Sequence, residues 1–216
     1  MHAKTSLCVL LMALAGSNVV TYLAFRRPAV VNYQTDSLAI DAMSRSEGPF
    51  VLMIGDSITE RSKLAADVCG VRLIKVGIGG SRASSFIPFA EEMNAKNLVP
   101  SLIVIALGLN DANHIYRSDF RTSYNLLIDS LPKVPLILAT LTPVEDERMD
   151  RASAVDTIIR NTAAERGLNL IDLGVLKEFK TTDGIHLTDR AYTSWSEKIV
   201  SGIRAAVCGR VSQARP

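Results

Sequence analysis

A serine stands at the point where a buried strand would end. Ser57 directly follows Gly55 and Asp56, which come after the apolar residues 50–54. Serine is a preferred residue at helix starts, so Ser57 could serve only as a cap. Its hydroxyl could also act as a nucleophile, provided that a general base takes its proton and an acid orients that base. The second interpretation requires a histidine and a carboxylate elsewhere in the chain.

Few histidines are available to act as that base. The chain contains His2, His114 and His186. The first lies in the N-terminal leader, and the second follows Asp111 in a segment that we expect to be exposed. His186 follows Asp183 by three residues, close enough for the carboxylate to accept a hydrogen bond from Nδ1–H and fix the tautomer. We therefore predict that Ser57 is the nucleophile, His186 the base and Asp183 the acid.

An acyl-transfer reaction also needs donors for the oxyanion, set about 3 Å from it. The backbone N–H of Ser57, the side-chain amide of Asn110 and a glycine N–H within residues 77–84 can supply them. Asp111 is expected to make a local turn with its side chain, as aspartate often does. Asn110 is expected to point into the site.

The elements that would position these residues are visible in the hydrophobic pattern. Five near-continuously apolar runs are typical of parallel strands covered on both faces. They span residues 50–54, 71–76, 102–107, 135–141 and 168–173. Helical patterns alternate with these runs, which predicts a doubly wound α/β sandwich of three layers. The candidate site residues follow the carboxyl ends of the strands, where such sheets bind ligands.

Four short motifs thus stand in one order along the chain: Gly-Asp-Ser, a glycine, Gly-x-Asn-Asp and Asp-x-x-His. Each is weak alone, but the ordered set resembles the SGNH (GDSL-type) hydrolase superfamily. By that resemblance Ser57 is the nucleophile, with Asp183 and His186 as acid and base. Ser57, Gly80 and Asn110 would donate to the oxyanion. The first motif departs from the family pattern by an isoleucine after the serine, and neighbouring glycines leave the register of Gly80 open by one position.

The resemblance covers roughly residues 50–205 and implies a flavodoxin-like three-layer α/β/α sandwich. Its five-stranded parallel sheet would have the strand order 2-1-3-4-5. The implied activity is hydrolysis of carboxylic esters or thioesters, with no cofactor and no metal. We expect short acyl groups on a small-molecule or polysaccharide carrier, because the chain has no insertion long enough to form a lid. An acyltransferase that uses the same residues and a non-catalytic binding module are the alternatives.

A second serine competes with Ser57. Residues 79–83 approximate the G-x-S-x-G nucleophile elbow of α/β-hydrolases, which would make Ser81 the nucleophile. The acid and base crowd into one short loop late in the chain, and this arrangement favours Ser57. Arg82 is expected to be a solvated or turn residue, and contact with the substrate is the alternative for Arg82 and for His114.

The N-terminal part of the chain has a different character. Residues 7–25 carry no charge and are long enough to cross a bilayer, and small residues at 13–15 are also typical of a signal-peptide cleavage site. We expect residues 1–25 to be a signal peptide or a single membrane anchor; a buried helix is the third alternative. A tether at 26–48, the hydrolase domain at 49–209 and a tail at 210–216 would follow. This organisation predicts an extracytoplasmic protein, either periplasmic or secreted.

Charge and cysteines add two further expectations. The net charge is only +2 and the basic residues are scattered, which argues against a nucleic-acid partner. Cys8 lies in the leader, whereas Cys69 and Cys208 lie in the domain, just after the first helix and just after the last one. Those two helices should share one face of the sheet, which would bring the cysteines close together. They are either a disulfide or two unrelated buried thiols.

Overall fold

The computed structural model describes residues 36–113 and 119–213. Its centre is a sheet of six strands in the order β2-β3-β1-β4-β5-β6. The strands are β1 (Phe50–Gly55), β2 (Asp67–Val68), β3 (Val71–Gly77), β4 (Leu102–Ala106), β5 (Leu136–Ala139) and β6 (Asn169–Ile171). β1, β3 and β4 are almost wholly buried, as expected for strands covered on both faces.

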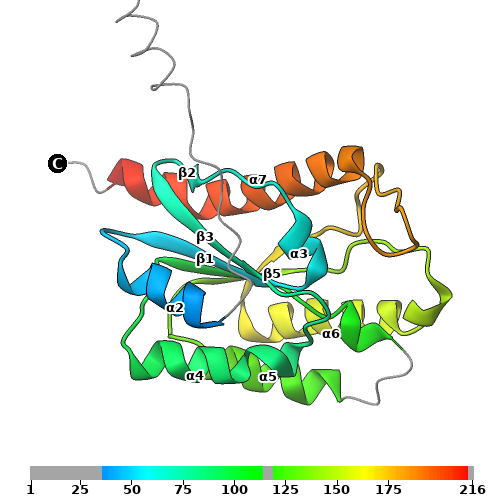
Figure 1. Ribbon diagram of the computed structural model, residues 1–216, viewed down its shortest axis with the longest axis horizontal. Helices are drawn as coiled ribbons and strands as arrows, with labels where there is room; N and C mark the ends of the chain where they lie inside the picture. Colours follow the sequence, from blue (N-terminus) through cyan, green and yellow to red (C-terminus); the bar gives the residue numbers. More distant parts are fainter. Residues whose placement is uncertain (1–35, 114–118, 214–216) are drawn as a thin grey trace, which may run out of the picture.

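Helices cover both faces of the sheet (Figure 1). One face carries α2 (Asp36–Ser44), α4 (Ile87–Ala95), α5 (Phe120–Ser130) and α6 (Ala152–Arg166). The other face carries the short α3 (Ser57–Arg61) and the long α7 (Asp189–Gln213). Short 3-10 helices η1 (Ala83–Phe86), η2 (Asn110–Ala112) and η3 (Glu147–Met149) lie in the loops. The predicted three-layer α/β/α sandwich is confirmed.

The expected sheet needs one correction. The five predicted runs are β1, β3, β4, β5 and β6; they pair in parallel and in the predicted order. The sheet is not five-stranded, however, because β2 adds a short antiparallel strand beside β3. A strand of two residues leaves no hydrophobic period to detect. Its turn is a hairpin in which Cys69 and Gly70 both have positive φ, a geometry that suits the twist of paired strands.

The register of the central strands brings the candidate loops to one edge. Gly55 at the end of β1 pairs with Gly77 at the end of β3 and with Ala106 at the end of β4. The three strands therefore end at the same level. The segments that follow them begin side by side at the carboxyl edge of the sheet.

Part of the expected tether is structured. Residues 36–44 form α2, which buries Ala39, Ile40 and Met43 in the core. These three buried residues are spaced as on one face of a helix. The sequence analysis did not identify this helix because polar residues surround the three apolar ones. At the other end, α7 continues to Gln213, into the expected tail. The leader at 1–25 lies outside the described residues, and none of the described helices is long and apolar enough to cross a membrane.

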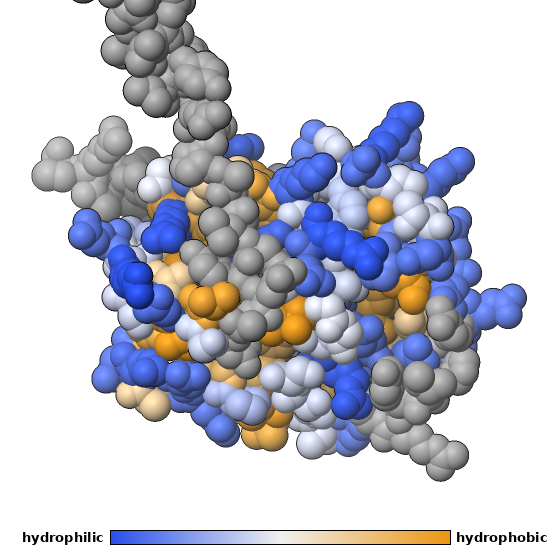
Figure 2. Space-filling model, viewed as in Figure 1, coloured by the Kyte–Doolittle hydropathy of each residue, from blue (hydrophilic) through white to orange (hydrophobic). Residues whose placement is uncertain are grey.

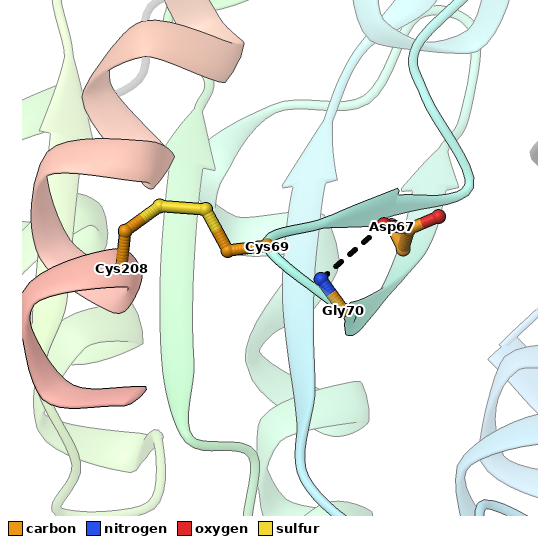
Figure 3. The surroundings of a disulfide bond; sticks show 4 residues. All are labelled: Asp67, Cys69, Gly70 and Cys208. Carbon is orange, nitrogen blue, oxygen red and sulfur yellow. Dashed lines mark hydrogen bonds between the residues drawn. A yellow bond between two sulfur atoms is a disulfide. The ribbon is translucent and has the colours of Figure 1, made fainter. Parts of the chain in front are cut away.

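The two domain cysteines form a disulfide (Figure 3). The Cα atoms of Cys69 and Cys208 lie 5.7 Å apart, within the range that a disulfide requires. The bond joins the β2–β3 turn to α7, at the end of the sheet opposite the carboxyl edge. The expectation that these cysteines lie together is confirmed, and of the two alternatives the structure shows the pair.

Candidate active site

The turn from β1 into α3 places Ser57 at the sheet edge. Asp56 is the N-cap of α3, and its carboxylate accepts a hydrogen bond of 2.9 Å from the N–H of Ile58. Ser57 is the first residue of the helix. The helix packs so closely on the end of β3 that a Cβ at Gly77 would lie 2.3 Å from the backbone nitrogen of Glu60. Glycine is required there by this contact, and the contact fixes the direction of α3.

The three predicted catalytic side chains form one chain of hydrogen bonds. The Nε2 atom of His186 lies 3.0 Å from Oγ of Ser57. The Nδ1 atom of His186 lies 2.7 Å from Oδ2 of Asp183. With Nδ1 protonated and donating to the carboxylate, Nε2 is free to accept the serine proton. The structure thus brings together Ser57, His186 and Asp183 in the geometry that the sequence analysis predicted.

Asp183 is held in its ionised form. Besides the imidazole, its other oxygen accepts hydrogen bonds from the backbone N–H groups of Ile185 (3.1 Å) and His186 (2.7 Å). The hydrogen bond from His186, followed by these backbone bonds, keeps the pKa of Asp183 well below its usual range. This favours the charged carboxylate, the form that stabilises an imidazolium.

The loop that carries the acid and base is braced by its own backbone and by a neighbouring loop. The N–H of Thr182 donates to the carbonyl of His186 at 2.7 Å. Two successive N–H groups, of Glu145 and Asp146, donate to the carbonyl of Gly184 at 2.8 and 3.0 Å. The segment after β5 therefore supports the loop after β6, and the position of His186 does not depend on side chains alone.

Asn110 lies in η2 and is linked to the glycine loop. Its Nδ2 donates to the carbonyl oxygen of Ser81 at 3.0 Å. An amide nitrogen carries two hydrogens, so one remains for another acceptor. Holding the amide group in place before the substrate arrives is what an oxyanion donor requires. The role of Asn110 as a donor stays a prediction.

Asp111 does more than the local turn that was expected of it. Its carboxylate is fully buried and accepts a hydrogen bond of 3.1 Å from the N–H of Ala83, at the start of η1. This bond joins the loops after β3 and β4 across 28 positions of sequence. A turn propensity describes only neighbouring residues, so it could not indicate this partner, which the fold supplies. The local turn itself stays a prediction.

The glycine loop passes beside the nucleophile. A Cβ at Gly79 would lie 2.9 Å from Oε2 of Glu60 and 3.9 Å from Cβ of Ser57. Gly80 has a φ of +74°, in the left-handed region that other residues rarely adopt. The loop backbone can therefore approach Ser57 as an oxyanion donor must, and the choice of Gly80 within it stays a prediction.

The competing nucleophile and the candidate substrate contacts are placed less favourably. His186 bonds to Ser57, whereas the N–H of Ser81 closes a turn onto the carbonyl of Ile78 at 3.2 Å. The backbone N–H of Arg82 donates to Oγ of Ser85, within the capping of η1. His114 lies outside the described residues. The structure therefore gives Ser57, and not Ser81, the partners that a nucleophile needs.

Sequence analysis missed a buried lysine behind the nucleophile. Lys75 on β3 is only 2% exposed, and its Nζ donates to the carbonyls of Glu60 (3.0 Å) and Ser62 (2.6 Å). It thus satisfies carbonyls at the C-terminal end of the helix that begins with Ser57. Burial lowers its pKa to about 8, although the charge of Glu60 opposes this. A lysine inside an otherwise apolar strand was the available signal.

Asp56 is a second buried group of the site that was not singled out. It is 3% exposed, and burial raises its pKa to about 7, opposed by the N–H of Ile58 and reinforced by the charge of Asp111. Burial and the nearby negative charge both favour the protonated form of Asp56.

In the part of the chain that the structure describes, no three side chains of the metal-binding types form a group that could hold an ion.

A comparison with known protein families matches the part of the chain that contains the candidate site residues. A family model described as "GDSL-like Lipase/Acylhydrolase family" matches residues 53–193. No curated protein matches the sequence significantly. Among solved structures, a lipase/acylhydrolase from Enterococcus faecalis is 22% identical, with a TM-score of 0.62, and the match covers 74% of this chain and 97% of that one.

Two further similar structures carry more specific names. Est24, a carbohydrate acetylesterase from Sinorhizobium meliloti, is 16% identical with a TM-score of 0.59; the match covers 74% of this chain and 100% of that one. A catalytic mutant of Axe2, an acetylxylan esterase from Geobacillus stearothermophilus, is 18% identical with a TM-score of 0.56; the match covers 73% and 95%. At such identities the likeness shows the shared fold.

Proposed function

Because the chain belongs to the GDSL-like lipase/acylhydrolase family, we propose that it is a serine esterase that hydrolyses carboxylic esters through an acyl-enzyme on Ser57. The observation that carries this proposal is the continuous hydrogen-bond chain from Ser57 through His186 to Asp183. A helix cap needs no such chain, since the cap of α3 is already supplied by Asp56.

In the first half of the reaction, Oγ of Ser57 attacks the carbonyl carbon of the ester while Nε2 of His186 takes the hydroxyl proton. The imidazolium that forms is stabilised by the ionised carboxylate of Asp183. Negative charge develops on the carbonyl oxygen, which accepts hydrogen bonds from the N–H groups of Ser57 and Gly80 and from Nδ2 of Asn110. The His186 proton then passes to the leaving alcohol, and the acyl group stays on Ser57.

In the second half, a water molecule attacks the acyl carbon and His186 takes a proton from that water. The same donors hold the second oxyanion. Its collapse breaks the bond to Oγ of Ser57, which regains the proton from His186, and the carboxylic acid leaves. Each step uses groups of this chain alone, so neither a metal nor a cofactor enters the mechanism.

The substrate that we propose is a short acyl ester, such as acetate, on a polar or carbohydrate carrier. The names of Est24 and Axe2 support this choice by analogy of fold. The disulfide between Cys69 and Cys208 supports an oxidising, extracytoplasmic compartment. The proposal includes an N-terminal segment, residues 1–25, that acts either as a cleaved signal peptide or as a membrane anchor.

The test is hydrolysis of p-nitrophenyl esters of increasing acyl length by the purified full-length protein, beside release of acetate from an acetylated polysaccharide. We expect turnover that is highest for the shortest acyl groups and absent from Ser57→Ala. Product analysis with an added acceptor alcohol distinguishes hydrolysis from acyl transfer to the alcohol. If the acyl group goes mainly to the alcohol and not to water, the protein is an acyltransferase. No labelling by an organophosphonate and no turnover of any ester would mean a binding module.

A further inference from the structure

A groove lies between α7 and the chain at the end of α3. The helices α3 and α7 cover the same face of the sheet (Figure 1). Its volume of about 670 Å³ is in the range of ligand sites. The groove exists because α3 is short: its C-cap, Ser62, has extended backbone, and the chain then turns away to β2. Residues 61–65 form one wall, and one face of α7 forms the other.

One end of this groove lies beside the catalytic pair. Arg61 in one wall is one helical turn from Ser57, and Asp189 in the other wall is three residues from His186. Tyr192, three residues after Asp189 on α7, lines the groove as well, and the charges of Arg61 and Asp183 both reach its hydroxyl. From Asp189 the groove follows α7 to Arg204, about 22 Å along the helix axis at 1.5 Å per residue. A carrier whose ester sits at Ser57 can therefore extend along it.

The groove presents charged groups of both signs. Arg61, Lys63 and Arg204 line it, and across the described residues none of them forms an ion pair. The carboxylates of Asp189 and Glu197 line it as well, again without an ion-pair partner among the described residues. Because these charged side chains form no ion pair among the described residues, they can bind a ligand that both donates and accepts hydrogen bonds.

We propose that this groove binds the carrier of the ester and that the carrier is a neutral oligosaccharide. Hydroxyl groups donate to carboxylates and accept from cations, so they suit both signs of charge in the groove. A polyanion would meet Asp189 and Glu197, and an alkyl chain would leave all five charged groups without partners. Leu64, Val200 and the ring of Tyr192 also line the groove and offer apolar surface to the C–H faces of sugar rings.

The surface of the molecule agrees with a polar partner. On the face shown in Figure 2, hydrophilic residues dominate, and hydrophobic residues appear in separate patches between them. Among the described residues, the large exposed hydrophobic side chains are Leu38, Val99, Leu126 and Val175, and none of these four lines the groove.

The inference rests on the proposed esterase function, so its test compares two esters in one protein. The probes are p-nitrophenyl acetate, which is too short to follow the groove, and an acetylated xylo-oligosaccharide. Ser196→Trp fills the middle of the groove from α7. Ser201→Trp is the matched control, because Ser201 is exposed on the same helix and does not line the groove. Thr193→Trp is a second blocking variant at an exposed groove position.

We expect the ratio of kcat/KM for the oligosaccharide ester to that for p-nitrophenyl acetate to fall about tenfold or more in the blocking variants, mainly through KM. The ratio should keep its wild-type value in Ser201→Trp. Binding of deacetylated xylo-oligosaccharide can also be measured by calorimetry in protein that carries Ser57→Ala. The affinity should fall when Ser196→Trp or Thr193→Trp is added, and this readout does not depend on turnover.

An unchanged ratio in both blocking variants, or an equal fall in the control, would overturn the groove as the carrier site while the esterase function stands. An acetylated acidic oligosaccharide serves as a third probe: if kcat/KM falls in the blocking variants for this ester and not for the xylo-oligosaccharide ester, the choice of a neutral carrier is overturned. If the wild type hydrolyses neither ester, the proposed function itself has failed, and the inference fails with it.

Discussion

The hydroxyl of Ser57 lies 3.0 Å from Nε2 of His186, although 129 positions of sequence separate the two residues. The fold closes this distance by ending β1 and the segment after β6 at the same edge of the sheet. The other nitrogen of His186 is held by Asp183, so both the position and the tautomer of the base are set before a substrate binds.

The orientation of the base depends on the charge of Asp183. Asp183→Asn would leave a side chain of the same shape but would favour the wrong tautomer of His186, so we expect kcat to fall by about three to four orders of magnitude. Stopped assays of ester hydrolysis with a thermal melt as folding control measure this. A variant that folds normally and keeps a tenth of the wild-type kcat would show that Asp183 is not the orienting acid.

Asn110→Ala should lower kcat by roughly two to three orders of magnitude, because one donor to the oxyanion is removed. KM should change far less, since the oxyanion exists only beyond the ground state. Asn161→Ala, at an exposed position on α6, is the matched control and should behave as wild type. An increase in KM with an unaltered kcat would place Asn110 in substrate binding instead.

Lys75 should stabilise the helix that presents Ser57. Lys75→Met leaves the carbonyls of Glu60 and Ser62 without their donor, and each unsatisfied buried group costs about 1–3 kcal/mol. We therefore expect a loss of about 2–6 kcal/mol in the free energy of unfolding by denaturant titration at neutral pH. A variant as stable as the wild type would mean that water replaces the ammonium.

The lowered pKa of Lys75 also predicts a pH dependence of stability. Between about pH 8, where folding places this pKa, and its ordinary value near 10.5, the unfolded chain binds more protons than the folded one. The contribution of Lys75 to stability should therefore rise as pH increases through that window. Lys75→Arg, which stays charged, should lack the rise; equal pH profiles for both proteins would contradict the shift.

The disulfide should stabilise the fold without serving the chemistry. Replacing Cys69 and Cys208 together by serine should lower the free energy of unfolding by about 2–5 kcal/mol, since the bond closes a long loop. The kcat of the double variant should match the wild type, because the bond lies at the end of the sheet away from Ser57. A large loss of kcat at full folding would link that end to the active site.

Much of the fold followed from hydrophobic pattern alone. The five parallel strands are near-continuous apolar runs, and such runs identify strands covered on both faces. β2 could not be found this way, because two residues carry no period and its pairing with β3 depends on a turn at Cys69 and Gly70. α2 was overlooked because its three buried residues lie in a polar segment.

The residues of the candidate active site could be predicted because each stands in a short motif of its own. The groups that hold them could not, since their partners come from other strands. Asp111 reaches Ala83, and Lys75 reaches the carbonyls of the Ser57 helix; neither contact leaves a mark in the neighbouring sequence. For Lys75 the available signal was its place in a mostly apolar run, residues 71–76, which indicates burial but not the carbonyls that it binds.

The central claim is that the acyl group passes through Ser57, and trapping that intermediate tests it most directly. The full-length protein is mixed with p-nitrophenyl acetate, quenched in acid within one turnover and digested for mass spectrometry. We predict one added acetyl group on the peptide that contains Ser57, absent from Ser57→Ala and present in Ser81→Ala. An acetyl group on Ser81, or hydrolysis that continues in Ser57→Ala with no labelled serine, would contradict the account.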